Sequence, residues 1–143
     1  MTSSRRCVIA IDAGTTGVRS RAIFPGGGEV IADYREFEQH YPQPGWVEHD
    51  PVEIWEAVKA TLAHTIGSVG VGNVAAIGIT NQRETVLAWN RRTGQPYGSA
   101  IVWQDRRTAG RCDQLTEAGI LPQVRDVTGL VLDPYFSGSK VEW

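Results

Sequence analysis

Three short runs with strand-like patterns follow one another in the first 37 residues, separated only by tight turns. Cys7–Ala13 is apolar enough for a buried strand, and Val18–Phe24 alternates small or apolar side chains with arginines. After the glycine-rich turn Pro25–Gly28, the segment Glu29–Phe37 has the pattern of a third strand. This spacing predicts three antiparallel strands joined by tight turns.

A proline- and glycine-containing connection, residues 38–50, separates these strands from a predicted helix. Asp50 can cap the helix and Pro51 suits its first turn, while Gly67 and Gly70 are expected to end it. An apolar stripe at helical spacing should pack on a sheet; it consists of Trp55, Val58, Leu62 and Ile66.

The remaining residues predict shorter elements in the order strands, then helices. The expected strands are 74–80, 85–89 and 99–103, with a hairpin turn at 90–94, and the expected helices are 108–117 and 121–127, followed by Gly129 as the stop. Strands, a helix, more strands and more helices indicate an α/β or α+β layered domain. The length of 143 residues suits one domain.

Composition excludes several functional classes. Fourteen Lys and Arg against sixteen Asp and Glu give a net charge of −2, so no broad attraction to nucleic acid or anionic lipid is expected. The longest apolar runs are too short to span a bilayer, and no secretory signal is recognisable. With only two cysteines, a disulfide framework is implausible, and a reducing cytoplasmic location is predicted.

The turn between the first two strands, residues 12–17, carries the first chemical signal. Gly14 allows a ligand to approach the backbone closely, and the hydroxyls of Thr15 and Thr16 can donate to phosphate oxygens, as can backbone N–H groups. Asp12 could hold Mg²⁺ directly or through water. The nucleotide motifs that open a helix are absent here. The alternative interpretation is an ordinary hairpin whose Asp and Gly serve turn geometry.

Four longer stretches lie downstream of this turn: Gly45–Pro51, Gly78–Thr85, Val102–Thr108 and Thr128–Lys140. Together with residues 12–17, and in this order, they resemble the FGGY family of carbohydrate kinases, in particular its members that phosphorylate glycerol. The resemblance implies an actin-like ATPase (ribonuclease H-like) α/β fold, in which a mixed sheet with three antiparallel first strands is flanked by helices. Residues 1–143 would then be part of the N-terminal domain of two.

The resemblance also implies a polyol site. In such kinases the residues that match Arg83, Glu84 and Tyr135 bind the substrate hydroxyls, and the one that matches Trp103 lines the carbon backbone. Their chemistry suits this role, because Arg83 only donates hydrogen bonds, an ionised Glu84 only accepts them, and Tyr135 can do either. The alternatives are a solvated Arg–Glu pair, a core tryptophan and a turn aromatic.

Neighbouring strand residues point to opposite faces of a sheet, so Arg83 and Glu84 cannot both face one pocket from within a strand. We therefore predict that the strand ends near Thr80 and that Asn81 begins a loop.

The resemblance further implies that ATP and Mg²⁺ are used. Thr15 and Thr16 match positions that contact ATP phosphates, and Arg19 matches one that contacts the nucleotide phosphates. Ala13 and Gly17 depart from the polar residue and the serine that many members carry. The loss of the serine hydroxyl removes one possible phosphate donor, although a backbone N–H could still serve.

In these kinases the catalytic aspartate and the adenosine pocket lie farther along the chain. No catalytic residue is therefore expected within residues 1–143, and this chain alone is predicted to be inactive. It ends at Trp143 without a stop signal, as a cut chain would, and the full-length protein is expected to be a homo-oligomer, a dimer or tetramer. Two alternatives remain: a polyol-binding or scaffold module without turnover, and a kinase of the same family for another sugar such as a pentulose, against which Asn81–Thr85 argues.

Overall fold

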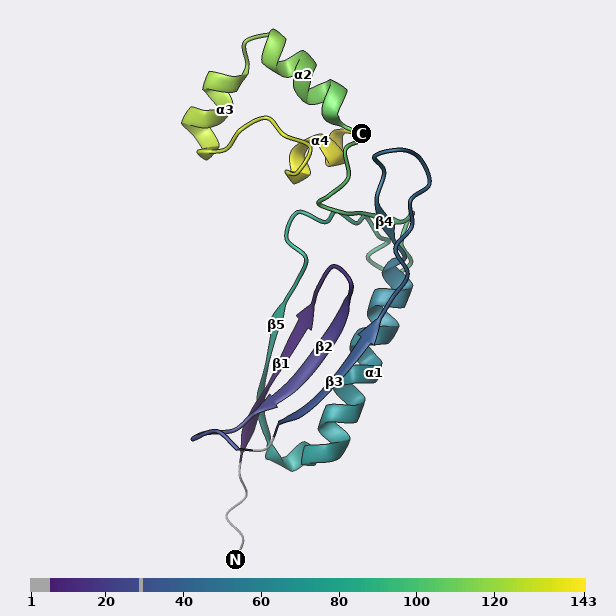
Figure 1. Ribbon diagram of the computed structural model, residues 1–143, viewed down its shortest axis with the longest axis vertical. Coiled ribbons are helices and arrows are strands. Elements are labelled where there is room, and N and C mark those ends of the chain that lie inside the picture. The colour runs from purple at the N-terminus through teal and green to yellow at the C-terminus, as the bar shows by residue number, and fades with distance from the viewer. Residues whose placement is uncertain (1–5, 29) are drawn as a thin grey trace, which may run out of the picture. The chain divides into compact units, whose positions relative to one another are not determined.

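The computed structural model describes residues 6–28 and 30–143, which divide into two compact units. The first unit contains the residues up to Glu38 together with Pro51–Gln82, and the second contains Gln39–Asp50 together with Arg83–Trp143 (Figure 1). Each unit has its own sheet and helices, and each is described separately.

The first unit contains a four-stranded mixed sheet with the order β3-β2-β1-β5. Strands β1 (Cys7–Ala13), β2 (Gly17–Ile23) and β3 (Ile31–Glu36) pair antiparallel, as predicted. Strand β5 (Val74–Thr80) lies parallel to β1, so the carboxyl ends of these two strands meet at one edge of the sheet. The predicted start of the third strand, Glu29, lies outside the described residues.

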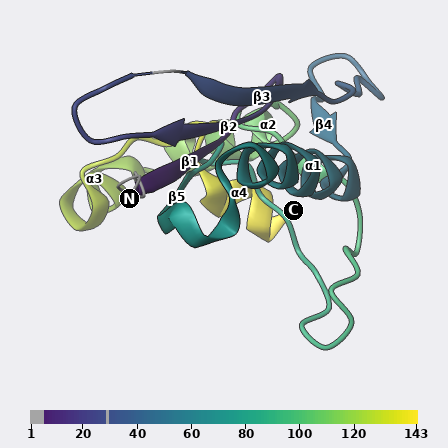
Figure 2. The same ribbon diagram turned by 90° about the horizontal axis from the view of Figure 1, so that it is seen from below.

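Helix α1 (Pro51–Val69) covers one face of this sheet, packing mainly on β2 and β3 (Figure 2). The buried cluster consists of Ile9, Ile11, Val18 and Ala57, with Ile54, Val58, Leu62 and Ile66 packed against it. The alternation predicted for β2 is confirmed, since Val18, Ser20 and Ala22 are buried.

The predicted apolar stripe of α1 was wrong at Trp55, which is 58% exposed. The Lys59 ammonium lies 5.8 Å from the centre of its ring. The helix instead faces the sheet with two buried threonines among its apolar residues. Thr61 donates to the Ala57 carbonyl at 2.9 Å and Thr65 to the Thr61 carbonyl at 3.0 Å, so both hydroxyls are satisfied within the helix.

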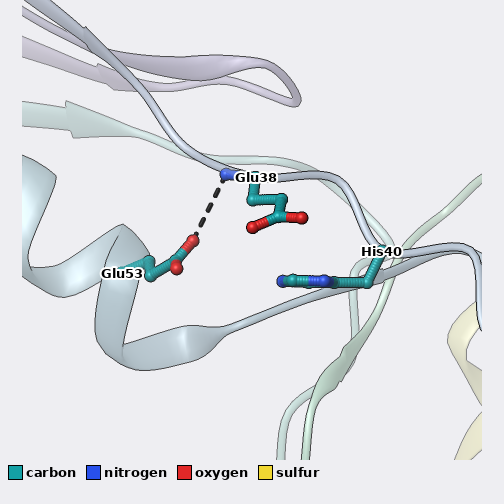
Figure 3. A group of neighbouring side chains, drawn as sticks. All are labelled: Glu38, His40 and Glu53. Carbon is teal, nitrogen blue, oxygen red and sulfur yellow. Dashed lines mark hydrogen bonds between the residues drawn. The ribbon is translucent and has the colours of Figure 1, made fainter.

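The first turn of α1 is bonded to neighbouring backbone, and its last turn ends at a glycine. In its first turn, a carboxylate oxygen of Glu53 accepts the backbone N–H of Glu38 at 3.2 Å (Figure 3). At the other end the prediction was wrong for Gly67, because the helix continues through it, and correct for Gly70, which has a φ of +80° and follows the last helical residue. A short 3₁₀ helix, η1 (Val71–Asn73), then leads into β5.

The second unit contains a two-stranded antiparallel sheet and three helices. The strands are β4 (Glu48–His49) and β6 (Ala100–Ile101), and the helices are α2 (Ala109–Glu117), α3 (Leu121–Thr128) and α4 (Ser137–Glu142). The predictions of α2, α3 and the Gly129 stop are confirmed; Gly129 has a φ of +73° and its N–H bonds to the Arg125 carbonyl. Helix α4 was not predicted.

The strand predictions for the second unit were too long. Segment 85–89 makes only isolated bridges, at Val86 and Trp89, and the predicted strand 99–103 is reduced to β6. The chain turns after two residues because the N–H of Asp105 bonds back to the Val102 carbonyl at 2.9 Å. The predicted turn is confirmed, since Gly94 donates to the Asn90 carbonyl at 2.8 Å.

A buried arginine holds the centre of the second unit together. The Arg107 side chain, 2% exposed, bonds to Asp105 at 2.9 Å and to Glu48 at 2.6 Å. Its guanidinium lies 3.7 Å from the ring centre of Trp46 and 4.8 Å from that of Trp143. Within residues 6–28 and 30–143, none of the helices combines the length and apolar character needed to cross a membrane.

Candidate functional site

The predicted phosphate-binding turn joins β1 to β2 in the first unit. The N–H of Gly14 donates to the Gly17 carbonyl at 3.0 Å, which closes the turn. A Cβ on Gly14 would lie 3.3 Å from that carbonyl oxygen, so a side chain here would press on the turn itself. Thr15 is half-buried and Thr16 is exposed. The turn is therefore compact, with its threonines at its tip.

Gly17 is required by packing. A Cβ at this position would lie 2.5 Å from the Arg35 carbonyl oxygen and 2.7 Å from the Tyr34 ring and hydroxyl, closer than real contacts allow. The Tyr34 hydroxyl is 3.3 Å from the Thr16 hydroxyl, within hydrogen-bond reach. A tyrosine hydroxyl from β3 thus stands beside the turn, in space that a larger residue at position 17 would fill.

Strand register brings four polar side chains into one row across the sheet. Tyr34 is opposite Arg19, Arg19 is opposite Asp12, and Asp12 is opposite Thr80. All four are exposed, on the face of the sheet away from α1. The Arg19 guanidinium also lies 5.2 Å from the centre of the Tyr34 ring. A carboxylate, a guanidinium and two hydroxyls therefore share this face.

The predicted polyol residues lie in the second unit. Strand β5 ends at Thr80, which confirms the prediction that a loop begins at Asn81. Arg83 and Glu84 occupy a turn, where Glu84 has a φ of +63°, in the left-handed region that non-glycine residues rarely adopt. The turn frees the two side chains from strand alternation. Arg83 is exposed and Glu84 is half-buried.

The Glu84 carboxylate is bound at one oxygen by the start of α4. Its Oε2 accepts the backbone N–H of Ser137 at 2.8 Å and the Ser137 hydroxyl at 2.7 Å. The hydrogen bond from the Ser137 hydroxyl is the main cause that lowers the pKa of Glu84; burial opposes it, and the Ser137 N–H and Lys140 add to it. Glu84 is therefore a stable carboxylate, and its Oε1 takes part in neither bond.

Two aromatic residues complete this group. The Trp103 and Tyr135 rings are 5.9 Å apart in an edge-to-face arrangement, and Phe136 packs against Tyr135 at 5.1 Å. Asp133 sets the turn that presents Tyr135, because its side chain accepts the Tyr135 N–H at 2.8 Å.

One buried side chain links the loop of Glu84 to that of Tyr135. The Lys140 ammonium donates to the backbone carbonyl of Glu84 at 2.8 Å and to that of Tyr135 at 2.6 Å. The structure thus holds the backbone of Glu84 and of Tyr135 on one ammonium and packs Trp103 against Tyr135, with Arg83 next to Glu84 in the chain. These four residues are called the polyol cluster below.

Comparison with known proteins identifies the family. Residues 7–143 match the FGGY family of carbohydrate kinases, N-terminal domain. The chain belongs to this family. It is 55% identical over 139 residues to a protein named glycerol kinase from Methylibium petroleiphilum, and 51% identical over 143 residues to one of the same name from Vibrio cholerae. These alignments cover 95% and 99% of this chain but 28% of each relative.

Solved structures of FGGY kinases share the architecture. The Plasmodium falciparum glycerol kinase with ADP superposes with a TM-score of 0.89 at 30% identity, over 97% of this chain and 28% of its own. A gluconate kinase from Lactobacillus acidophilus gives 0.88 at 21% identity, over the same shares, which shows the fold alone. The chain therefore has the actin-like ATPase fold of the FGGY kinases, as predicted, and corresponds to their N-terminal portion.

An apolar cavity of about 420 Å³ also lies in the second unit of this FGGY chain. Its walls come from α2, α3, α4 and the segment 130–136, and among the predicted site residues only Glu84 lines it. A mostly apolar lining does not suit a small alcohol, whose hydroxyls need partners. We therefore place the candidate site at the polyol cluster.

Sequence reasoning missed four neighbours of these sites: Tyr34, Thr80, Ser137 and Lys140. The first two become visible only when strand register is known, because their roles depend on which residues stand opposite Asp12 and Arg19. Ser137 and Lys140 lie inside the motif 128–140, but residues 137–142 are almost all polar or glycine, so no hydrophobic periodicity predicted a helix there.

Proposed function

We propose that the protein to which this chain belongs transfers the γ-phosphoryl group of ATP to a terminal hydroxyl of glycerol, giving sn-glycerol 3-phosphate. Residues 1–143 would be part of the N-terminal domain of two. The observation that carries the proposal is the grouping of Glu84, Tyr135 and Trp103 in the second unit. Membership of the FGGY family and the two relatives named glycerol kinase support it.

The polyol cluster suits glycerol in its hydrogen-bonding character. Glu84 is an ionised acceptor, Arg83 is a donor, and the Tyr135 hydroxyl can serve as either. The Trp103 ring next to Tyr135 offers an apolar surface to the carbon chain. A site with fixed donors and acceptors discriminates strongly against alcohols that leave them unpaired.

The turn 12–17 is proposed to bind ATP phosphates. Gly14, Thr15, Thr16 and Gly17 would offer backbone N–H groups and hydroxyls, and Arg19 on the same strand pair would add a positive charge. Asp12 fits a Mg²⁺ role, because its exposed carboxylate stands opposite the Thr80 hydroxyl, and Mg²⁺ is usually held by one or two carboxylates with phosphates and water. Bound there, Mg²⁺ would neutralise phosphate charge.

None of the four polyol-cluster residues is proposed as the catalytic base. Phosphoryl transfer usually needs a carboxylate that accepts the hydroxyl proton. The pKa of Glu84 is lowered, so its carboxylate is a weak proton acceptor and is better suited to orienting a hydroxyl. The base is therefore proposed to lie in the rest of the protein. The full-length protein is further proposed to be a cytoplasmic homo-oligomer.

A substrate panel tests this function. The purified full-length protein is assayed for ADP release with MgATP and glycerol, D-xylulose or gluconate, and the isolated 143-residue chain is assayed beside it. Glycerol should be phosphorylated at least about a hundredfold more efficiently than the two sugars, and the isolated chain should show no turnover. Preference for D-xylulose or gluconate would assign the protein to another FGGY activity, and absence of turnover in the full-length protein would favour a binding module. Activity of the isolated chain would show that the catalytic base lies within residues 1–143, against the proposal.

A further inference from the structure

Lys140 is a buried lysine whose ammonium contacts backbone at two separate loops. The residue is 3% exposed, and its Nζ lies 2.8 Å from the carbonyl oxygen of Glu84 and 2.6 Å from that of Tyr135. We propose that Lys140 is a positioning residue for the polyol: it fixes these two loops so that their side chains meet one bound alcohol. This inference rests on the proposed function.

The cost of burying this group argues for a specific role. Moving an ammonium out of water is unfavourable, and burial lowers the pKa of Lys140, although the negative charges of Glu84, Asp105 and Asp133 oppose that effect. The short bonds of the ammonium go to carbonyl oxygens. An apolar side chain would fill the same space without this penalty, but it could not join the two carbonyls.

The backbone at Glu84 needs such support. Its φ of +63° is unfavourable for a residue with a Cβ and persists only when its surroundings hold it in place. Lys140 binds the Glu84 carbonyl, while Ser137 binds the carboxylate through its N–H and its hydroxyl. Both donors come from α4, one helical turn apart, so this short helix holds Glu84 at the main chain and at the side chain.

The Tyr135 contact gives the same ammonium a second function. Tyr135 follows the turn set by Asp133, and its ring packs against Trp103. Because Lys140 is bound to the Tyr135 carbonyl, a shift of α4 would move the tyrosine and the glutamate together. Loss of the ammonium should therefore loosen hydroxyl recognition and leave the turn 12–17, in the other unit, unaffected.

The test uses the full-length protein with Lys140→Met, which keeps the length of the side chain and removes its donors, and Lys140→Arg, which keeps a charged donor. Lys59→Met is the matched control, because Lys59 is an exposed lysine of the first unit. We expect Lys140→Met to raise the KM for glycerol at least about tenfold and to change the KM for ATP less than about twofold. Lys140→Arg should recover part of the loss, and Lys59→Met should behave as wild type.

A second readout separates positioning from general damage. Glycerol should raise the Tm of the wild type and of Lys59→Met, and this rise should be lost in Lys140→Met, while the rise given by MgADP persists. An unchanged glycerol KM in Lys140→Met, or equal increases in both KM values, would overturn the inference. If Lys140→Met is insoluble, the same comparison is made with Lys140→Gln, which removes the charge and shortens the side chain, and an unchanged glycerol KM in that variant overturns the inference. A wild type that does not phosphorylate glycerol would instead refute the proposed function.

Discussion

At single positions of this chain, packing constrains the choice of residue as much as binding chemistry does. At Gly17 the resemblance to FGGY kinases suggested only the loss of a serine hydroxyl, a possible phosphate donor. The structure adds a steric reason, because Tyr34 and the Arg35 carbonyl occupy the space of a side chain at position 17. A hydroxyl remains next to the turn, but it comes from Tyr34 on β3, 3.3 Å from Thr16.

Gly17→Ala should therefore destabilise the first unit by about 1–3 kcal/mol, because the new Cβ would displace β3 or the Tyr34 ring. Gly67→Ala is the matched control: Gly67 is an exposed glycine inside α1, a Cβ added there would meet open space, and alanine should stabilise by up to about 1 kcal/mol. The Tm values of the full-length variants measure both effects. Similar shifts in the two variants would argue against the close approach of β3.

Elements differ in how well their sequences predict them. The strands β1 and β2, the helices α2 and α3, and the loop after Thr80 follow from local patterns and were predicted nearly residue by residue. The errors arose where tertiary contacts decide. Trp55 was placed in the core because the helical stripe was counted from apolar residues alone, whereas α1 buries Thr61 and Thr65.

The second unit was harder to predict because charge organises it. Its two-residue strands have little pattern of their own, and the ion pair between Glu48 and the buried Arg107 side chain connects β4 to the segment that follows β6. Burial raises the pKa of Asp105, but three hydrogen-bonding groups outweigh burial and lower the pKa overall. They are the Arg107 side chain and the backbone N–H groups of Arg107 and Val47. Conversely, burial lowers the pKa of Arg107, and its bonds to Asp105 and Glu48 raise it overall. A pattern of apolar residues in the sequence cannot reveal a buried ion pair of this kind.

Arg107→Met should cost about 3–5 kcal/mol, because it leaves the buried Asp105 carboxylate without its counter-charge. The neighbouring Arg106→Met is the control, since Arg106 is 55% exposed and its pair with Asp133 should contribute no more than about 1 kcal/mol. Thermal unfolding and soluble yield of the full-length variants give the comparison. If the two substitutions had equal effects, the buried pair would not be the centre of the second unit.

At the scale of the whole molecule, the residues proposed to contact the two substrates belong to different units of the chain. The residues proposed for ATP phosphates and Mg²⁺ belong to the first unit, and the polyol cluster belongs to the second. The chain spans 28% of the length of the glycerol kinases it matches. The roles of single residues could be predicted only through the family resemblance, because Arg-Glu pairs and turn tyrosines are common in proteins without such a site.

Because these contacts are separate, substitution in the polyol cluster should affect one substrate and not the other. The most direct measurement is the pair of KM values for glycerol and for ATP in the full-length protein carrying Arg83→Ala. Loss of a charged donor to a substrate hydroxyl should raise the glycerol KM about 10- to 100-fold and leave the ATP KM within about twofold. Arg91→Ala, at an exposed arginine in the 90–94 turn, should change neither. Equal increases in both KM values, or an unchanged glycerol KM, would contradict the assignment of the polyol site.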